Sequence, residues 1–130
     1  TGKDTQGISL LELGETSKNE IGLPVNALLW RASLDIASSI PIDDIDTFGG
    51  TILTDWYQLN ENSDERIKLA IFVLDRELRS DGIRVVVYVQ KRDDSEWHDE
   101  GTDSEMGVRL EELILTRARE IRAATISETN

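Results

Sequence analysis

Residues 66–92 read RIKLAIFVLDRELRSDGIRVVVYVQKR, and this stretch decides the fold. Its two halves, 66–76 and 83–92, are rich in β-branched and aromatic residues, which pack well on the pleated surface of a sheet. Between them, Ser80-Asp81-Gly82 is typical of a hairpin turn. The stretch therefore predicts two strands that pair antiparallel.

The preceding segment 50–57 predicts a third strand, because Ile, Leu and Thr are followed there by Trp and Tyr. A polar connection over 60–65 joins it to the second strand, which predicts an antiparallel meander. Alternation of apolar residues in the hairpin predicts one buried face. That face consists of Ile67, Leu69, Ile71 and Val73 on one strand and Ile83, Val85, Val87 and Val89 on the other.

The second face of the predicted sheet also carries large apolar residues. An antiparallel sheet with one helix layer is expected to be polar on its free face. We therefore expect either the N-terminal segment or another subunit to cover this face. The candidate interaction surface consists of Leu53, Tyr57, Phe72, Leu74, Val86 and Tyr88, with Ala70 among them.

Two amphipathic helices flank the predicted sheet. The first spans 26–40, with Asn26 as N-cap, and it ends before Pro41. The second spans 104–124 and starts at a capping box formed by Thr102 and Glu105. The sequence thus predicts an α+β fold, in which an antiparallel meander of three to four strands lies between an N-terminal and a C-terminal helix.

The chain of 130 residues has the usual size of one domain, which we assign to 23–125. Residues 1–22 are polar and glycine-containing, which predicts a flexible linker. A short apolar patch over 8–13 interrupts this linker and could dock onto the domain. Residues 126–130 are expected to form a disordered tail.

Acidic residues outnumber basic ones by 26 to 14, and the net charge is −12. Such a charge repels phosphate backbones, so nucleic acid is not an expected partner. It also disfavours peripheral attachment to anionic lipid. Without cysteine, the chain can form neither disulfides nor zinc sites with sulfur ligands. The sequence contains no run of 18 apolar residues, so no transmembrane segment is predicted.

Patterns that would indicate catalysis or metal binding are weak. The single histidine, His98, is interpreted as part of an acidic loop and not as a general base. The acidic clusters at 43–46 and 93–103 are expected to be solvated loops, because they lack the spacing of a calcium-binding EF-hand loop. Gly49-Gly50 lacks the Lys of a phosphate loop and indicates a backbone requirement. We therefore expect no enzyme activity, no cofactor and no metal.

Aromatic and arginine residues give further expectations. Trp30 is expected in the core. Trp56 and Tyr57 could floor a ligand groove, although packing under the first helix is favoured. Arg76 and Arg79 are expected to pair with local carboxylates.

Four segments together resemble a known family: NALLWRASLD (26–35), FGGTILTDWY (48–57), LDRELRSDG (74–82) and LTRAR (115–119). In this order they are similar to an uncharacterised family of short alphaproteobacterial envelope proteins, a domain of unknown function often described as lipoproteins. The resemblance covers about residues 20–124. It implies a location on the periplasmic side of the envelope and a lipid anchor on a cysteine upstream of this chain. It implies no activity, cofactor or catalytic residue.

The order of elements is also similar to the helix-grip domains of lipoproteins in the outer-membrane protein assembly machinery, which is a likeness of architecture alone. We therefore expect a non-enzymatic envelope module that binds a protein partner or its own copy, as in a homodimer. The alternative is a carrier of a small molecule or lipid. Its cavity would lie between helix and sheet and include Trp56.

Overall fold

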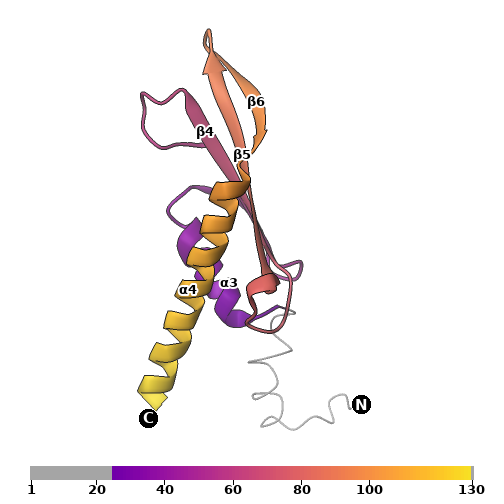
Figure 1. Cartoon of the computed structure of the whole chain (residues 1–130), viewed down its shortest axis with the longest axis vertical. Coiled ribbons are helices and arrows are strands. Elements are labelled where there is room, and N and C mark those ends of the chain that lie inside the picture. Colours follow the sequence, from indigo (N-terminus) through magenta and orange to yellow (C-terminus); the bar gives the residue numbers. More distant parts are fainter. Residues whose placement is uncertain (1–24, 130) are drawn as a thin grey trace.

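An antiparallel sheet and two helices make up the fold (Figure 1). The computed structural model describes residues 25–129, and the predicted linker over 1–22 lies outside them. The helices are α3 (Ala27–Ala37) and α4 (Ser104–Thr129). The strands are β1 (Ile42–Asp46), β2 (Thr51–Thr54), β3 (Tyr57–Gln58), β4 (Glu65–Val73), β5 (Ile83–Asp93) and β6 (Glu96–Thr102), with a short 3₁₀ turn (Ser80–Gly82) before β5.

The strands follow the order β1-β2-β4-β5-β6, and β3 also pairs with β4. The predicted α+β class is confirmed, but the sheet has six strands instead of three to four. The two edge strands, β1 (IDDID) and β6 (EWHDEGT), were expected to be acidic loops. Charged residues are common on edge strands because they discourage pairing with other chains. Their composition therefore pointed to loops, although both segments pair in the sheet.

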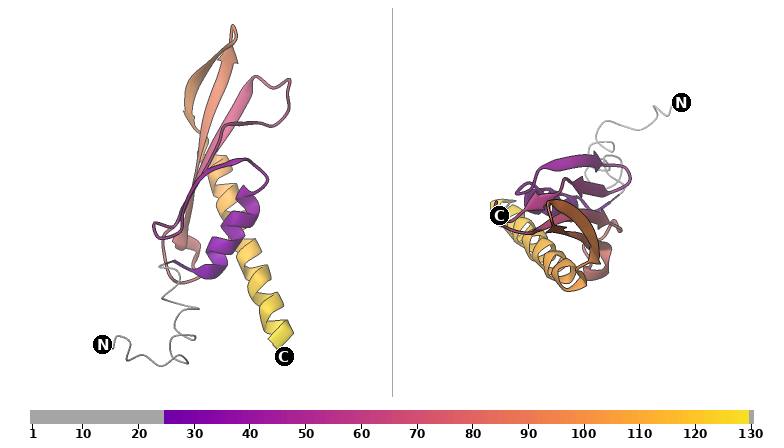
Figure 2. Two further views of the ribbon diagram at one scale, coloured as in Figure 1. Left: turned by 180° about the vertical axis from the view of Figure 1, so that it is seen from behind. Right: turned by 90° about the horizontal axis from the view of Figure 1, so that it is seen from above.

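Both helices pack on one face of the sheet, which we call the inner face. Figures 1 and 2 show α3 beside α4 on this face. The β5–β6 hairpin extends beyond the helices, at the end of the molecule away from the C-terminus of α4. Leu29 and Ile114 from the helices are fully buried, and Trp30 lies in the core as predicted. The predicted inner face is confirmed, with seven of its residues buried and Val89 partly buried: Ile67, Leu69, Ile71, Val73, Ile83, Val85 and Val87.

The chain leaves the sheet briefly between β2 and β3, and one threonine replaces the missing ladder bond. The Thr54 hydroxyl, fully buried, accepts a hydrogen bond from the Leu69 N–H at 2.8 Å and donates one to the Asp55 carbonyl at 3.0 Å. Pairing with β4 resumes at Tyr57, which lies opposite Ile67. The predicted continuous strand over 50–57 is therefore two short strands, and the break shifts the alternation of side chains between them.

The N-terminus of α3 is tied to the connection between β4 and β5. Asn26 is the N-cap, as predicted, since its side-chain oxygen accepts the Leu29 N–H at 2.9 Å. Its side-chain amide donates to the Arg76 carbonyl at 3.0 Å, and its backbone N–H donates to the Asp75 carbonyl at 2.8 Å. The helix ends at Ala37, three residues earlier than predicted. Asn26 thus fixes the helix start against the β4–β5 connection.

A glycine lets the start of β2 pass close to the end of β4. Gly50 has φ +70°, and a Cβ there would lie 2.6 Å from the Val73 carbonyl oxygen and 2.9 Å from Val25 Cγ1. The Val73 N–H donates to the Gly50 carbonyl at 2.8 Å. The predicted backbone requirement is therefore confirmed at Gly50.

Helix α4 starts directly after β6 and covers the part of β5 that β6 does not reach. Its cap is Asp103, whose side chain accepts the Met106 N–H at 3.0 Å, so the prediction of Thr102 as cap was wrong by one residue. The Glu111 carboxylate accepts the Val85 N–H at 2.9 Å and so satisfies an edge donor of β5. The helix continues to Thr129, five residues past its predicted end and through most of the predicted tail.

Candidate functional site on the outer sheet face

The sheet face opposite the two helices, here called the outer face, carries most of the predicted interaction surface. Strand register brings Leu53, Ala70 and Val86 into one row across β2, β4 and β5. Phe72 lies opposite Arg84, and Tyr88 lies opposite Lys68. Ala70 is buried, and the large apolar residues are partly exposed, with Tyr88 the most exposed at 40%: Leu53, Phe72, Val86 and Tyr88.

The other two predicted surface residues behave differently. Leu74 follows β4 and continues the ladder, because its N–H donates to the Gly82 carbonyl at 2.8 Å, and it is 60% exposed. Tyr57 does not belong to the outer face, since it pairs with the inner-face residue Ile67. The placement of Tyr57 was therefore wrong. The cause is the break at Thr54, which changes the phase of the alternation.

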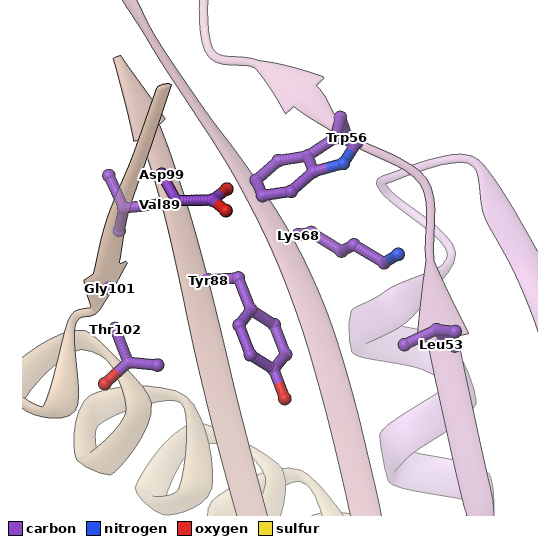
Figure 3. Close-up of a pocket in the computed structure, with 8 residues that line it drawn as sticks. All are labelled: Leu53, Trp56, Lys68, Tyr88, Val89, Asp99, Gly101 and Thr102. Atoms are coloured by element: carbon purple, nitrogen blue, oxygen red, sulfur yellow. The ribbon is translucent and has the colours of Figure 1, made fainter. Parts of the chain in front are cut away.

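The outer face is hollowed beside the apolar row. The hollow has a volume of about 430 Å³ and opens between the β2–β3 segment and β6 (Figure 3). Trp56 and Asp99 extend toward each other from its two sides, with Lys68 and Tyr88 between them (Figure 3). Its full lining is Leu53, Trp56, Lys68, Tyr88, Val89, Asp99, Gly101 and Thr102. Trp56 therefore contributes to a groove, on the opposite sheet face from the helix under which it was expected to pack.

Next to this hollow, two tryptophans enclose an arginine. The Arg66 guanidinium lies 5.1 Å from the ring centre of Trp56 and 4.3 Å from that of Trp97, within range of cation–π attraction. Arg66 Nε donates to Gln90 Oε1 at 2.8 Å, and Gln90 Nε2 donates to Asp99 Oδ1 at 2.6 Å. These contacts hold the walls of the hollow in place. Sequence reasoning missed the cluster, because it joins residues from three strands and from the β2–β3 connection.

Positive charge gathers on the two central strands of this face. The outer positions of β4 and β5 include Arg66, Lys68, Arg84 and Arg92 and no acidic residue, in a chain with a net charge of −12. Arg92 pairs with Asp64 at 3.3 Å. Lys68 and Arg84 make no ion pair with any residue in 25–129. Lys68 Nζ lies 5.9 Å from the ring centre of Trp56, so two cations without a carboxylate partner lie beside the apolar row.

A second, smaller groove lies on the inner face, between the helices and the sheet. Its volume is about 340 Å³, and two of its lining residues, Leu59 and Leu113, are 64% and 48% exposed. Tyr57 lines this groove. The other apolar residues around it are Ile36, Ile40, Ile67, Leu69, Met106 and Leu110.

The residues considered for catalysis and metal binding do not converge. His98 is exposed on β6, opposite Lys91, and it lies in a strand where a loop was expected. Within residues 25–129, no group of three or more His, Cys, Asp or Glu could hold a metal ion.

Arg79 pairs with the Asp81 carboxylate at 3.1 Å, and its expected pairing with a local carboxylate is therefore confirmed. Neither described helix contains an apolar stretch of the length that a membrane-spanning helix requires.

Comparison with known proteins gives the family. The model of a domain of unknown function, DUF3576, matches residues 23–123. An uncharacterized protein of Rickettsia prowazekii (strain Madrid E) is 35% identical over 105 residues, which cover 81% of this chain and 63% of that protein. No solved structure matches the chain. The resemblance to an uncharacterised alphaproteobacterial family is thus confirmed, and the chain belongs to the DUF3576 family of domains of unknown function.

Proposed function

We propose that this domain is a non-enzymatic binding module that uses its outer face to bind another protein. The observation that carries the proposal is the placement of both helices on the inner face, while the outer face exposes Leu53, Phe72, Val86 and Tyr88. Removing apolar surface from water is favourable by about 25 cal/mol per Å². Exposed apolar patches framed by polar residues are typical of interaction sites. Neither α3 nor α4 covers the apolar patch of the outer face.

Affinity capture with matched variants tests the proposal. Phe72→Glu and Val86→Glu place a charge in the centre of the outer face, and both side chains are partly exposed, so the fold is expected to tolerate them. Val108→Glu adds the same charge on α4, at a residue that is 51% exposed and lines neither groove. We expect the wild-type chain and Val108→Glu to retain the same partner from native cells, and both outer-face variants to lose it. Equal retention by all four chains would contradict the proposal.

Self-association is the second form of this proposal. Size-exclusion chromatography with light scattering measures it directly, over a range of protein concentrations. A dimer that dissociates in Val86→Glu but not in Val108→Glu would identify the partner as a second copy. A monomer at all concentrations would leave a different protein as the partner.

We further propose that the domain acts on the periplasmic side of the envelope and that the full-length protein has a lipid anchor. The family resemblance carried by the four sequence segments supports this location. Fractionation of native cells tests it, with the protein expected in the membrane fraction and released by detergent but not by salt. Recovery from the cytoplasmic fraction would contradict this location.

The inner-face groove favours one alternative, a carrier of a small apolar molecule. The groove is bounded almost entirely by apolar side chains, and about 340 Å³ is enough for part of a lipid chain or a small ligand. Trp56 takes no part in it, contrary to expectation, because it lies on the outer face. Native mass spectrometry of protein from its own cells should show a retained ligand that is lost in Leu113→Glu. Protein without any bound mass would argue against a carrier.

A further inference from the structure

The charge on the outer face specifies the chemistry of the partner. We propose that the outer face binds an acidic, apolar polypeptide segment in extended conformation, with two carboxylates that reach Lys68 and Arg84. This inference rests on the proposed function and narrows it.

The first argument is the distribution of charge. The chain carries a net charge of −12, yet the outer positions of β4 and β5 hold four cations and no acid. Arg66 is engaged by Gln90 and two tryptophan rings, and Arg92 is engaged by Asp64. Lys68 also lies over the Trp56 ring, but neither Lys68 nor Arg84 has a carboxylate partner among residues 25–129. A bound acidic segment would supply the missing charges.

The second argument is the spacing of these two cations. Arg84 lies opposite Phe72, and Lys68 is four residues from Phe72 along β4. At about 3.4 Å per residue, the two positions are about 14 Å apart along the strands. The apolar row of Leu53, Ala70 and Val86 lies between them. In an extended segment, alternate side chains share one face, so carboxylates at i and i+4 and an apolar residue at i+2 match this pattern.

The same cations argue against a face-to-face pair of identical domains. In such a pair, Lys68 and Arg84 of one copy would approach cations of the other across a desolvated surface. Like charges placed opposite each other oppose association. The charges therefore favour an acidic segment as the occupant over the same face of a second copy.

Synthetic nonapeptides test the inference directly. The first has Glu at two positions four residues apart, with Leu midway between them and Ser or Thr elsewhere, and the matched peptides replace both Glu residues by Gln or by Lys. Fluorescence anisotropy of labelled peptides gives the affinity at low and at high salt. Because each exposed charge pair contributes modestly, we expect the Glu peptide to bind about 2- to 30-fold tighter than the Gln peptide. We expect the Lys peptide to bind weakest, and the differences to shrink in salt.

Reversing the charges of Lys68 and Arg84 tests whether they contact the peptide, because a purely structural role of these residues would not exchange the preference between the Glu and Lys peptides. The double variant Lys68→Glu/Arg84→Glu should prefer the Lys peptide to the Glu peptide. The control Arg119→Glu/Arg122→Glu changes the net charge equally at two exposed positions of α4 and should keep the wild-type preference.

The outcomes separate this inference from the proposed function. Equal binding of the Glu and Gln peptides, abolished by Val86→Glu, would overturn the charge argument and leave the outer face as the binding site. Binding unaffected by Val86→Glu would place the peptide away from the outer face and overturn the inference. Failure of every peptide to bind would overturn the inference, while the capture experiment decides the proposed function on its own. Sedimentation with phosphatidylglycerol vesicles that depends on Lys68 and Arg84 would also overturn it, in favour of a membrane surface.

Discussion

Replacing Thr54 by valine should destabilise the domain by about 1–3 kcal/mol, although the two side chains have nearly the same shape. The Thr54 hydroxyl is fully buried and accepts the Leu69 N–H at 2.8 Å, where β2 has left the ladder of β4. Valine would leave this buried donor without an acceptor, and a buried donor without a partner costs about 1–3 kcal/mol. The corresponding loss in Tm is about 4–12 °C for a domain of this size.

Urea unfolding followed by tryptophan fluorescence measures this loss. Thr51→Val is the matched control, because Thr51 lies in the same strand, is partly exposed, and its hydroxyl makes no hydrogen bond within residues 25–129. We expect the control to change the free energy of unfolding by no more than about 0.5 kcal/mol. Thr54→Ser keeps the hydroxyl but removes a buried methyl group, so it should lose no more than about 1 kcal/mol. Equal stability of Thr54→Val and Thr51→Val would refute the assigned role of this hydroxyl.

Three further predictions concern the backbone and the helices. Gly50→Ala should be more destabilising than Gly101→Ala, because only a Cβ at Gly50 would meet other atoms. Both glycines have positive φ, which alone costs an alanine about 1–2 kcal/mol. Thermal unfolding of the two variants measures the difference, and equal losses of stability would contradict the prediction. Asn26→Ala should lower the free energy of unfolding by about 0.5–2 kcal/mol through loss of the helix cap, measured by chemical denaturation, whereas a neutral change would show that the cap is dispensable. The ion pair between Asp35 and Arg117, at 3.2 Å and nearly half exposed, should contribute about 1 kcal/mol or less in a double-mutant cycle, and a larger coupling would contradict its assignment as a surface pair.

The inner face and the core were predictable from the sequence. Strict alternation in 66–92 identified the buried residues of β4 and β5, because one face of a sheet under helices must be apolar. Asn26 as N-cap and Trp30 as a core residue followed from local rules in the same way. A local sequence pattern predicts the position of a residue correctly where that residue faces only one environment, such as the core.

The edge strands and the phase of β3 were not predictable in this way. The edge strand β1 has solvent along one side and three aspartates among its five residues, so its composition resembles a loop. Tyr57 was misplaced because the break at Thr54 depends on a side-chain hydrogen bond to a residue 15 positions away. Such a long-range contact leaves no periodic signal in the sequence.

The cations of the candidate site were visible in the sequence but were not recognised. Even-numbered residues of the stretch 66–92 include four cations, Arg66, Lys68, Arg84 and Arg92. The outer apolar residues Phe72, Val86 and Tyr88 are also even-numbered. Once the odd positions were assigned to the core, the even positions defined the opposite face. Reading their charges together would have predicted positive charge on the two central strands of the outer face of an acidic protein.

The central claim is that the outer face is covered by a partner in the native cell. A photo-crosslinking amino acid at position 86, compared with the same residue at position 108, tests it most directly, because Val86 lies in the centre of the outer face and Val108 is exposed on α4. We predict a discrete crosslinked protein from position 86, absent from position 108 and lost when Lys68 and Arg84 are reversed in charge. Crosslinking from position 108 alone, or from neither position, would contradict the claim.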